Sequence, residues 1–203
     1  MQVHCFRYFF IPYLLLLILA FTQVLVTNHG ATVLIFNEYH TPFLNNFFKV
    51  VTYGGDGYFF GVLVICVLIW NRKAGYILLI IGLIEGLTTW ILKQVFFSKI
   101  PRPMKFFEKT NLLKAIDGVE PKEFHSFPSG HTMMAFAVAV FFALVIRKRE
   151  WSVILLVIAA CVGLSRIYLN HHFLIDLAAG SLIGVFISYL CFIFFEKRLD
   201  LKV

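Results

Sequence analysis

Three short clusters of polar residues interrupt an otherwise apolar sequence, and each contains residue types that bind anionic groups. The first cluster holds Lys93, Lys99 and Arg102, the second is Pro128-Ser129-Gly130-His131, and the third runs from Ser165 to Asp176. Each cluster begins or ends a long apolar segment. Cations and histidines in these positions indicate a site for an anionic group beside a membrane.

The third cluster combines a fixed cation with a histidine and an acid. The Arg166 guanidinium is planar, always charged at neutral pH, and suited to phosphate or carboxylate. His172 and Asp176 are four residues apart, so on a helix they share one face and the carboxylate can orient the imidazole. His171 would point about 100° away on that helix, so we interpret it as a neighbour.

The second cluster opens a long apolar segment, which predicts a helix beginning near Ser129. The first amide groups of such a helix have no partner inside it, and Gly130 permits close approach, so this helix start can bind an anion. Ser129 can cap the helix or donate to a ligand oxygen, and His131 lies within the first turn. His125 precedes this cluster and reads as a solvated loop residue.

Together the clusters supply what phosphoryl transfer requires: donors around the phosphate oxygens, an in-line nucleophile and an acid for the leaving group. Lys93, Arg102 and Arg166 would supply positive charge, while Ser129 and the Gly130 amide would be neutral donors. One histidine would attack and another would protonate. The sequence shows no carboxylate-rich set for magnesium, so we expect the cations to replace a metal, with no cofactor.

The composition predicts an all-α, polytopic membrane protein. The chain has 203 residues, of which 60% are hydrophobic and only 14% are charged. A formal charge of +7 is compatible with nucleic-acid binding, but the sequence has no basic stripe with interleaved aromatic residues. We therefore expect the lipid bilayer as partner, no nucleic acid, and one membrane-embedded domain over residues 1–203, whose catalytic face is formed by 93–131 and 165–176.

Six apolar segments predict a bundle of six transmembrane helices. The first follows Arg7 and is interpreted as an uncleaved span, because no small-x-small cleavage site follows it. The four cysteines have neither zinc-ligand nor redox spacing and are interpreted as packing residues. The predicted spans are 8–27, 58–70 (which can begin earlier), 74–92, 131–146, 151–169 and 173–195.

Two further features accompany these spans. Apolar residues recur at helical spacing between Thr41-Pro42 and Gly54-Gly55, which predicts an amphipathic helix that lies in the interface or packs over the bundle. Glu85 lies near the middle of the third span, where a charge is costly. We favour a structural hydrogen bond from Thr88 or Thr89 over a proton relay.

With six spans, both termini share one side of the membrane. Each side of the membrane would carry nine lysine and arginine residues. Those on the side of the two termini lie in short connections and in the C-terminal tail. Short loops carry most weight in the positive-inside rule, which favours cytoplasmic termini and an extracytoplasmic site. The terminal-side cations include those of 71–73 and 147–150, together with Lys197, Arg198 and Lys202.

The clusters resemble the signatures of the type 2 phosphatidic acid phosphatase superfamily of integral membrane lipid phosphatases. Its second signature, Pro-Ser-Gly-His, is intact at 128–131, and its third, Ser-Arg-x5-His-x3-Asp, is intact at 165–176. The first signature, Lys-x6-Arg-Pro, is not matched in its spacing, because eight residues instead of six separate Lys93 from Arg102. Lys99, three residues before Arg102, is the alternative for this lysine.

The resemblance implies a phosphohistidine mechanism on a membrane lipid. His172 would be the nucleophile, Asp176 would fix its tautomer, and His131 would protonate the leaving group. The implied substrates are undecaprenyl diphosphate, phosphatidylglycerophosphate, phosphatidic acid or phosphorylated lipid A, in a bacterial inner membrane. The implied phosphate-binding residues are Lys93, Arg102, Ser129, Gly130 and Arg166.

Other functions use some of the same residues. A lipid phosphotransferase would use the same site with a lipid acceptor in place of water. A non-catalytic lipid-binding or transport protein is disfavoured, because transporters place polar groups at the midplane and contain repeats, neither of which we find here. A zinc enzyme using His171, His172 and Asp176 is weaker still, since adjacent histidines project differently.

Overall fold

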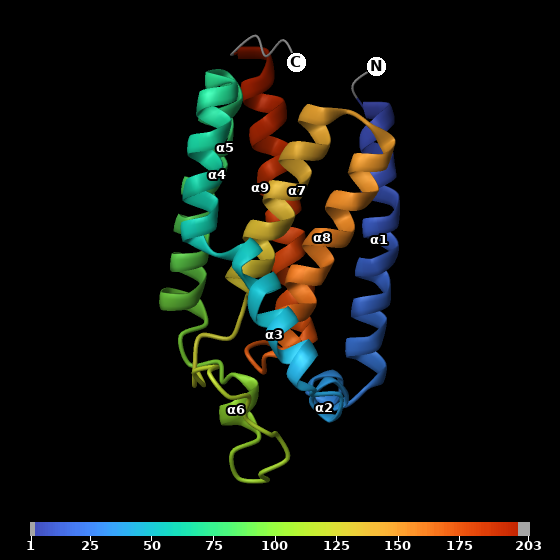
Figure 1. Cartoon of the computed structure of the whole chain (residues 1–203), viewed down its shortest axis with the longest axis vertical. Helices are drawn as coiled ribbons and strands as arrows, with labels where there is room; N and C mark the ends of the chain where they lie inside the picture. The colour runs from blue at the N-terminus through green and yellow to red at the C-terminus, as the bar shows by residue number, and fades with distance from the viewer. Residues whose placement is uncertain (1–2, 199–203) are drawn as a thin grey trace.

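The computed structural model describes residues 3–198, and every regular element in that range is a helix (Figure 1). Lys202 and the side chains of Cys5 and Arg198 lie outside the described part, as do both ends of the predicted domain. The helices are α1 (Val3–Val26), α2 (Ala31–Glu38), α3 (Pro42–Val51), η1 (Thr52–Gly55), α4 (Gly57–Trp70), α5 (Arg72–Ile91), η2 (Leu92–Phe96), α6 (Pro103–Phe106), α7 (Gly130–Ile146), α8 (Arg149–Tyr168) and α9 (Leu174–Arg198).

The predicted all-helical membrane fold is confirmed, whereas the predicted number of spans is not. Four helices are long and apolar enough to cross a membrane, and a fifth crossing results if Pro42–Gly55 and Gly57–Trp70 form one bent span. Helix α7 is apolar but has only 17 residues. The four long spans are Phe6–Val26, Arg72–Phe96, Arg149–Tyr168 and Leu174–Lys197.

Helix α7 lies at the centre of the bundle and packs most closely against α9 (Figure 1). Gly180, Gly184 and Ser188 are spaced four residues apart, so they share one face of α9. A Cβ at Gly184 would overlap the backbone of Met133, and Ser188 Oγ donates to the Ala137 carbonyl at 2.7 Å. Small residues at this spacing allow two helix backbones to approach closely, as is common in membrane bundles.

Helix α3 packs against the end of α8, as one of the two interpretations of 42–53 predicted. Thr41 caps it, because its hydroxyl accepts from the Leu44 amide at 3.2 Å. The ring centroids of Phe48 and Tyr168 are 4.4 Å apart. The Tyr168 hydroxyl donates to Asn45 Oδ1 at 2.7 Å. Helix α3 continues through η1 into α4 with a bend of 54°.

The hydrogen bonds expected for Glu85 are absent. Its side chain is 1% exposed, and neither carboxyl oxygen has a partner within residues 3–198. The Thr89 hydroxyl instead faces Met133 of α7, 3.5 Å from its sulfur atom. The prediction that threonines one turn away bind this carboxyl group is therefore wrong.

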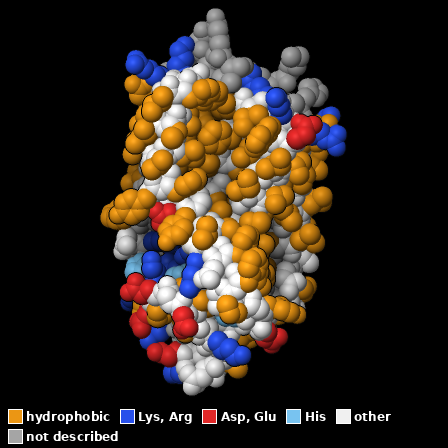
Figure 2. Space-filling model, in the orientation of Figure 1, with side chains coloured by type: hydrophobic (Ala, Val, Ile, Leu, Met, Phe, Trp, Pro, Cys, Tyr) orange, Lys and Arg blue, Asp and Glu red, His pale blue; other side chains and the backbone are white. Residues whose placement is uncertain are grey.

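The two ends of the bundle differ in character. The beginning of α1, the end of α9 and the short basic connections α4–α5 and α7–α8 lie at one end, whereas α2, α3, α6 and the loop 97–129 lie at the other (Figure 1). Hydrophobic side chains cover the middle of the surface, and charged side chains gather towards both ends (Figure 2). All three polar clusters lie at the end opposite the basic connections.

Candidate active site

The turn between α8 and α9 positions His172. The backbone amides of His171 and His172 both donate to the Arg166 carbonyl, at 2.9 and 3.2 Å, which closes the end of α8. Asn170 adopts a left-handed conformation with φ of 57°, which asparagine tolerates better than most residues. The chain therefore reverses within a few residues and starts α9 directly after the histidine pair.

Asp176 contacts His172, although His172 lies in the turn before α9 and does not share a helix face with Asp176 as we expected. Its Oδ2 atom lies 3.2 Å from His172 Nδ1 and accepts from Ser126 Oγ at 2.5 Å and from the Phe173 amide at 2.9 Å. With Nδ1–H donating to the carboxylate, the lone pair of His172 is on Nε2, which lies 3.4 Å from Arg102 Nη1.

Burial and positive charge keep His172 neutral. Its side chain is 2% exposed, and burial lowers its pKa well below the usual value. The charges of Arg102, Arg166 and Lys93 lower this pKa further. A neutral imidazole with its lone pair on Nε2 is the form that can attack phosphorus.

Three backbone carbonyls hold the Arg102 guanidinium beside His172. Arg102 donates from Nε to Phe124 at 2.8 Å, from Nη2 to His125 at 3.2 Å and from Nη1 to His171 at 3.1 Å. Burial lowers the pKa of Arg102 to about 10, so this group remains charged at neutral pH. A buried cation with such fixed geometry is suited to binding a phosphate oxygen.

Lys93 reaches the same place as Arg102, although the spacing between them is unusual. Lys93 Nζ donates to the His125 carbonyl at 3.0 Å, the same oxygen that Arg102 contacts. Lys93 lies in the π-helical turn η2, and such a turn accommodates an extra residue within a helix. Lys99 forms no side-chain hydrogen bond within the described part of the chain, so the geometry favours Lys93.

The second cluster forms the start of α7. The Ser129 hydroxyl caps the helix by accepting from the Thr132 amide at 3.4 Å and the Thr132 hydroxyl at 2.9 Å. The Ser129 amide donates to the Asp176 carbonyl at 3.1 Å, so it is not available to a ligand. The next two amides, of Gly130 and His131, have no acceptor among the described residues and could bind an anion.

Arg166 completes the cationic side of the site. It lies in the last turn of α8, is 5% exposed, and donates from Nη1 to Thr52 Oγ1 at 2.5 Å. Burial lowers the pKa of His171, and the positive charges of Arg166 and Arg102 lower it further. His171 itself offers a carbonyl to Arg102, and its Nδ1 atom has no partner in the described range.

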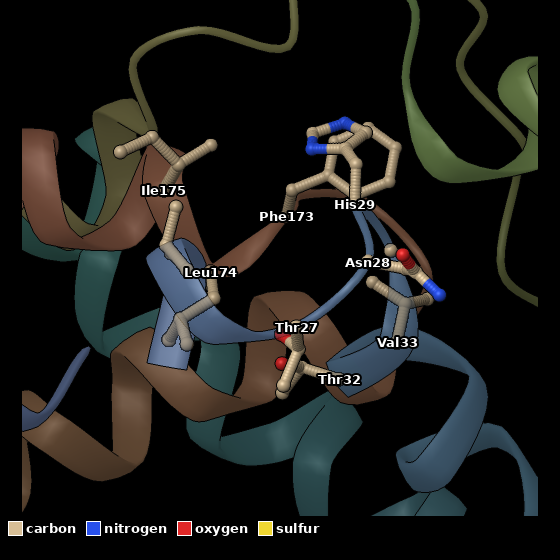
Figure 3. A pocket seen from close by; sticks show the side chains of 10 residues that line it. Thr27, Asn28, His29, Thr32, Val33, Phe173, Leu174 and Ile175 are labelled. Atoms are coloured by element: carbon tan, nitrogen blue, oxygen red, sulfur yellow. The ribbon is translucent and has the colours of Figure 1, made fainter. Parts of the chain in front are cut away.

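A small pocket is lined by His29 and by Phe173, the residue that directly follows His172 (Figure 3). Its volume is about 60 Å³, and the His29 ring lies over the Phe173 ring with centroids 4.2 Å apart. The Phe106 ring contacts both rings edge-on, at 5.1 and 5.5 Å. These aromatic contacts hold the residue that directly follows His172.

The structure thus gathers the predicted residues at one end of the bundle, and it adds others that the sequence did not reveal. Ser126 and Thr52 each bind a predicted residue, and His125, which we expected to be a solvated loop residue, supplies a shared carbonyl. None of these three residues is part of a sequence motif with a recognisable spacing. No group of three potential metal-ligating side chains is found among the described residues.

Comparison with protein families gives one match over most of the chain. The family model described as "PAP2 superfamily" matches residues 73–200, which include all three clusters. The chain is 34% identical over 122 residues to a Sulfolobus acidocaldarius protein named undecaprenyl-diphosphatase, covering 59% of this chain and 54% of that one. It is 43% identical over 61 residues to the bacitracin transport permease protein BcrC of Bacillus licheniformis, covering 30% and 29%. The matched regions therefore span about half the length of these curated relatives or less.

Two crystal structures share the fold. LpxE from Aquifex aeolicus has a TM-score of 0.69 with 29% identity, over 80% of this chain and 93% of that one. A PAP2-type phosphatidylglycerolphosphate phosphatase from Bacillus subtilis also has a TM-score of 0.69, with 24% identity over 94% and 97% of the chains. The second likeness supports the fold alone.

Proposed function

Since this chain belongs to the PAP2 superfamily, we propose that it hydrolyses a phosphomonoester or diphosphate on a membrane lipid. The observation that carries the proposal is the buried pair of His172 and Asp176, with His172 Nε2 directed towards Arg102. Such a pair provides an oriented, neutral nucleophile beside a cation.

In the proposed mechanism, His172 Nε2 attacks phosphorus while the bond from phosphorus to the leaving oxygen breaks. His131, which enters this step protonated, gives a proton to that oxygen and becomes neutral, and Asp176 stabilises the positive charge that forms on His172. A water molecule, deprotonated by His131, then attacks the phosphohistidine and releases inorganic phosphate. Each step conserves charge and protons without an additional reactant.

The cations would stabilise the phosphate oxygens during both steps. Arg102, Lys93 and Arg166 supply positive charge, and the amides of Gly130 and His131 supply neutral donors at the start of α7. Fixed donors that need not reorganise are effective in a buried site. In this proposal the Ser129 hydroxyl caps α7 and also donates to a phosphate oxygen, because accepting two hydrogen bonds from Thr132 leaves its proton available.

For the substrate, we propose a lipid diphosphate of the undecaprenyl type as the first to test. A Sulfolobus acidocaldarius relative named undecaprenyl-diphosphatase shares 34% identity with this chain over 122 residues. The phosphate on such a lipid lies at the membrane surface, and the site lies at one end of an apolar bundle (Figure 2).

We further propose one domain over residues 1–203 that crosses a bacterial cytoplasmic membrane six times, through α1, α4, α5, α7, α8 and α9. The 17 residues of α7 extend about 25 Å, somewhat less than the ~30 Å hydrocarbon core, so the site would lie near the depth of the lipid phosphates. Exposed Phe43 and Phe47 of α3 would contact lipid at the interface. The basic connections favour cytoplasmic termini and an extracytoplasmic site.

The test is phosphate release by the purified protein in detergent, with and without EDTA, over a panel of lipid phosphates. The panel contains undecaprenyl diphosphate, phosphatidylglycerophosphate, phosphatidic acid and phosphorylated lipid A. We expect release from at least one lipid, most rapidly from undecaprenyl diphosphate, and no effect of EDTA. Folded protein that releases phosphate from none of them would refute the proposed function.

A further inference from the structure

The turn η1 contacts two residues of the proposed site, although it belongs to none of the three sequence clusters. It lies at the 54° break between α3 and α4, where the backbone leaves the α-helical path. Irregular backbone at membrane depth is tolerated where it is buried in protein or lines a polar cavity. This turn contacts both α7 and α8, the helices that carry His131 and Arg166.

The first contact fixes the Arg166 guanidinium. Its Nη1 atom donates to Thr52 Oγ1 at 2.5 Å, and this is its one side-chain hydrogen bond within the described part of the chain. The Nε atom is buried and has no partner there. A guanidinium has five donors in a rigid plane, so a single fixed hydrogen bond helps to set where the remaining donors point.

The second contact places η1 against the start of α7. A Cβ atom at Gly55 would lie 2.5 Å from the His131 carbonyl oxygen and 2.8 Å from the His131 Cβ atom. Both are rigid parts of the chain, so any larger residue at this position would displace His131 or the turn. Gly57, two residues later, has open space around it, with nothing within 4 Å of a Cβ there.

We propose that η1 is a positioning element of the phosphate site, in which Thr52 orients Arg166 and Gly55 allows the turn to support His131. The inference rests on the proposed function for its catalytic consequence, but not for its effect on phosphate binding. The segment 52–55 thereby couples a phosphate-binding cation to the proposed acid, although the two lie on different helices.

The first test replaces the Thr52 hydroxyl while keeping the shape of the side chain. In Thr52→Val, the concentration of inorganic phosphate that half-maximally stabilises the detergent-solubilised protein against heat should rise about tenfold, since a charge-assisted hydrogen bond is lost. KM for the lipid should rise by a similar factor. Thr52→Ser should restore both values to within about twofold, because serine retains the acceptor.

Thr27→Val is the matched control for this substitution. The Thr27 hydroxyl, just beyond the end of α1, donates to the Gln23 carbonyl at 2.7 Å and should be dispensable for phosphate binding. If Thr52→Val binds phosphate as the parent protein does, or if Thr52→Ser fails to restore binding, the role assigned to Thr52 is wrong.

The second test adds one methyl group at Gly55. Gly55→Ala should lower kcat about tenfold or more through displacement of His131, while Gly57→Ala should leave kcat unchanged within about twofold. Equal activity of these two variants would contradict the role of Gly55. Should Gly55→Ala fail to fold, the Thr52 series alone decides the proposal.

The binding measurement separates this inference from the proposed function. If the parent protein binds inorganic phosphate but hydrolyses no lipid phosphate, the proposed function fails, while a tenfold effect of Thr52→Val on binding would still support η1 as a positioning element. If hydrolysis is found and the Thr52 variants behave like the parent, the function stands and the inference fails.

Discussion

The proposed site has two halves that are built in different ways. The helix-borne half consists of His131, Arg166, His172 and Asp176, which lie in or directly beside the starts and ends of α7, α8 and α9. The loop-borne half, named for the loop carbonyls that hold its side chains, consists of Lys93 in η2 and Arg102 in the loop 97–129. Carbonyl oxygens of this loop and of His171 hold these two side chains. Close packing of α7 against α9 fixes the first half, and backbone hydrogen bonds fix the second.

This difference suggests that the two halves contribute differently to catalysis. Bond formation needs a nucleophile and an acid held to within a fraction of an ångström, which rigid helices provide better than loops. Charge stabilisation tolerates more variation, because Coulomb interactions fall off gradually with distance. We therefore expect changes at His131, His172 and Asp176 of the helix-borne half to lower kcat. Changes in the loop-borne half, like changes that affect the Arg166 cation, should weaken phosphate binding.

The largest effect is expected for the proposed nucleophile. His172→Ala should lower phosphate release by at least about 10³-fold, because no other group is placed to attack. His171→Ala is the matched control, and it should retain activity within about tenfold, since its backbone carbonyl still holds Arg102. Comparable losses in the two variants would remove the distinction between the adjacent histidines.

The next effect concerns the acid that orients this nucleophile. Asp176→Asn should lower kcat by roughly 10²- to 10⁴-fold, because an amide cannot hold the required tautomer or stabilise the charge on His172. Ser126→Ala, which removes one hydrogen bond to Asp176, should cost only about tenfold. A change in KM without a change in kcat would contradict the role given to this pair.

A smaller effect is expected in the loop-borne half, where the two lysines can be compared. Lys93→Ala should weaken inorganic phosphate binding about tenfold, because it removes a cation that shares the His125 carbonyl with Arg102. Lys99→Ala should leave binding unchanged within about twofold. The opposite result would assign the first-signature lysine to Lys99.

The smallest effect is the pH dependence of stability. His172 is neutral in the folded protein because its pKa is lowered, whereas the unfolded chain takes up a proton below about pH 6.5. Stability is therefore fully present above pH 6.5 and lost as the pH falls, by up to about 1.4 kcal/mol per pH unit for this group. Thermal unfolding of the parent and of His172→Gln between pH 8 and pH 5 measures this, and the variant should show the shallower dependence.

The sequence predicted the helix-borne half well, because the long helices fall where apolar segments predicted them. Only three residues separate His172 from Asp176, and the turn before α9 brings the imidazole to the carboxylate even though His172 is not helical. The number of membrane crossings could not be fixed in the same way, because α7 is short and α3–η1–α4 is bent.

The loop-borne half was predicted less completely, for a physical reason. The spacing of Lys93 and Arg102 depends on a π-helical turn and an irregular loop, whose path follows from tertiary contacts. Thr52 lies 114 positions from Arg166, and Ser126 lies 50 positions from Asp176, so no local pattern connects either pair. Glu85 also shows that closeness in sequence does not ensure a contact, since the threonines one turn away do not bind its carboxyl group.

The central claim, that His172 carries the phosphate, can be tested by trapping the intermediate. His131→Asn, which lacks the proposed acid–base, is mixed with a lipid diphosphate bearing ³²P in its terminal phosphate, quenched in alkali within milliseconds and digested. We expect acid-labile, alkali-stable label on the peptide containing His172, and none when His172→Ala is added to the same chain. Label on another residue, or turnover by His172→Ala at the parent rate, would contradict the account.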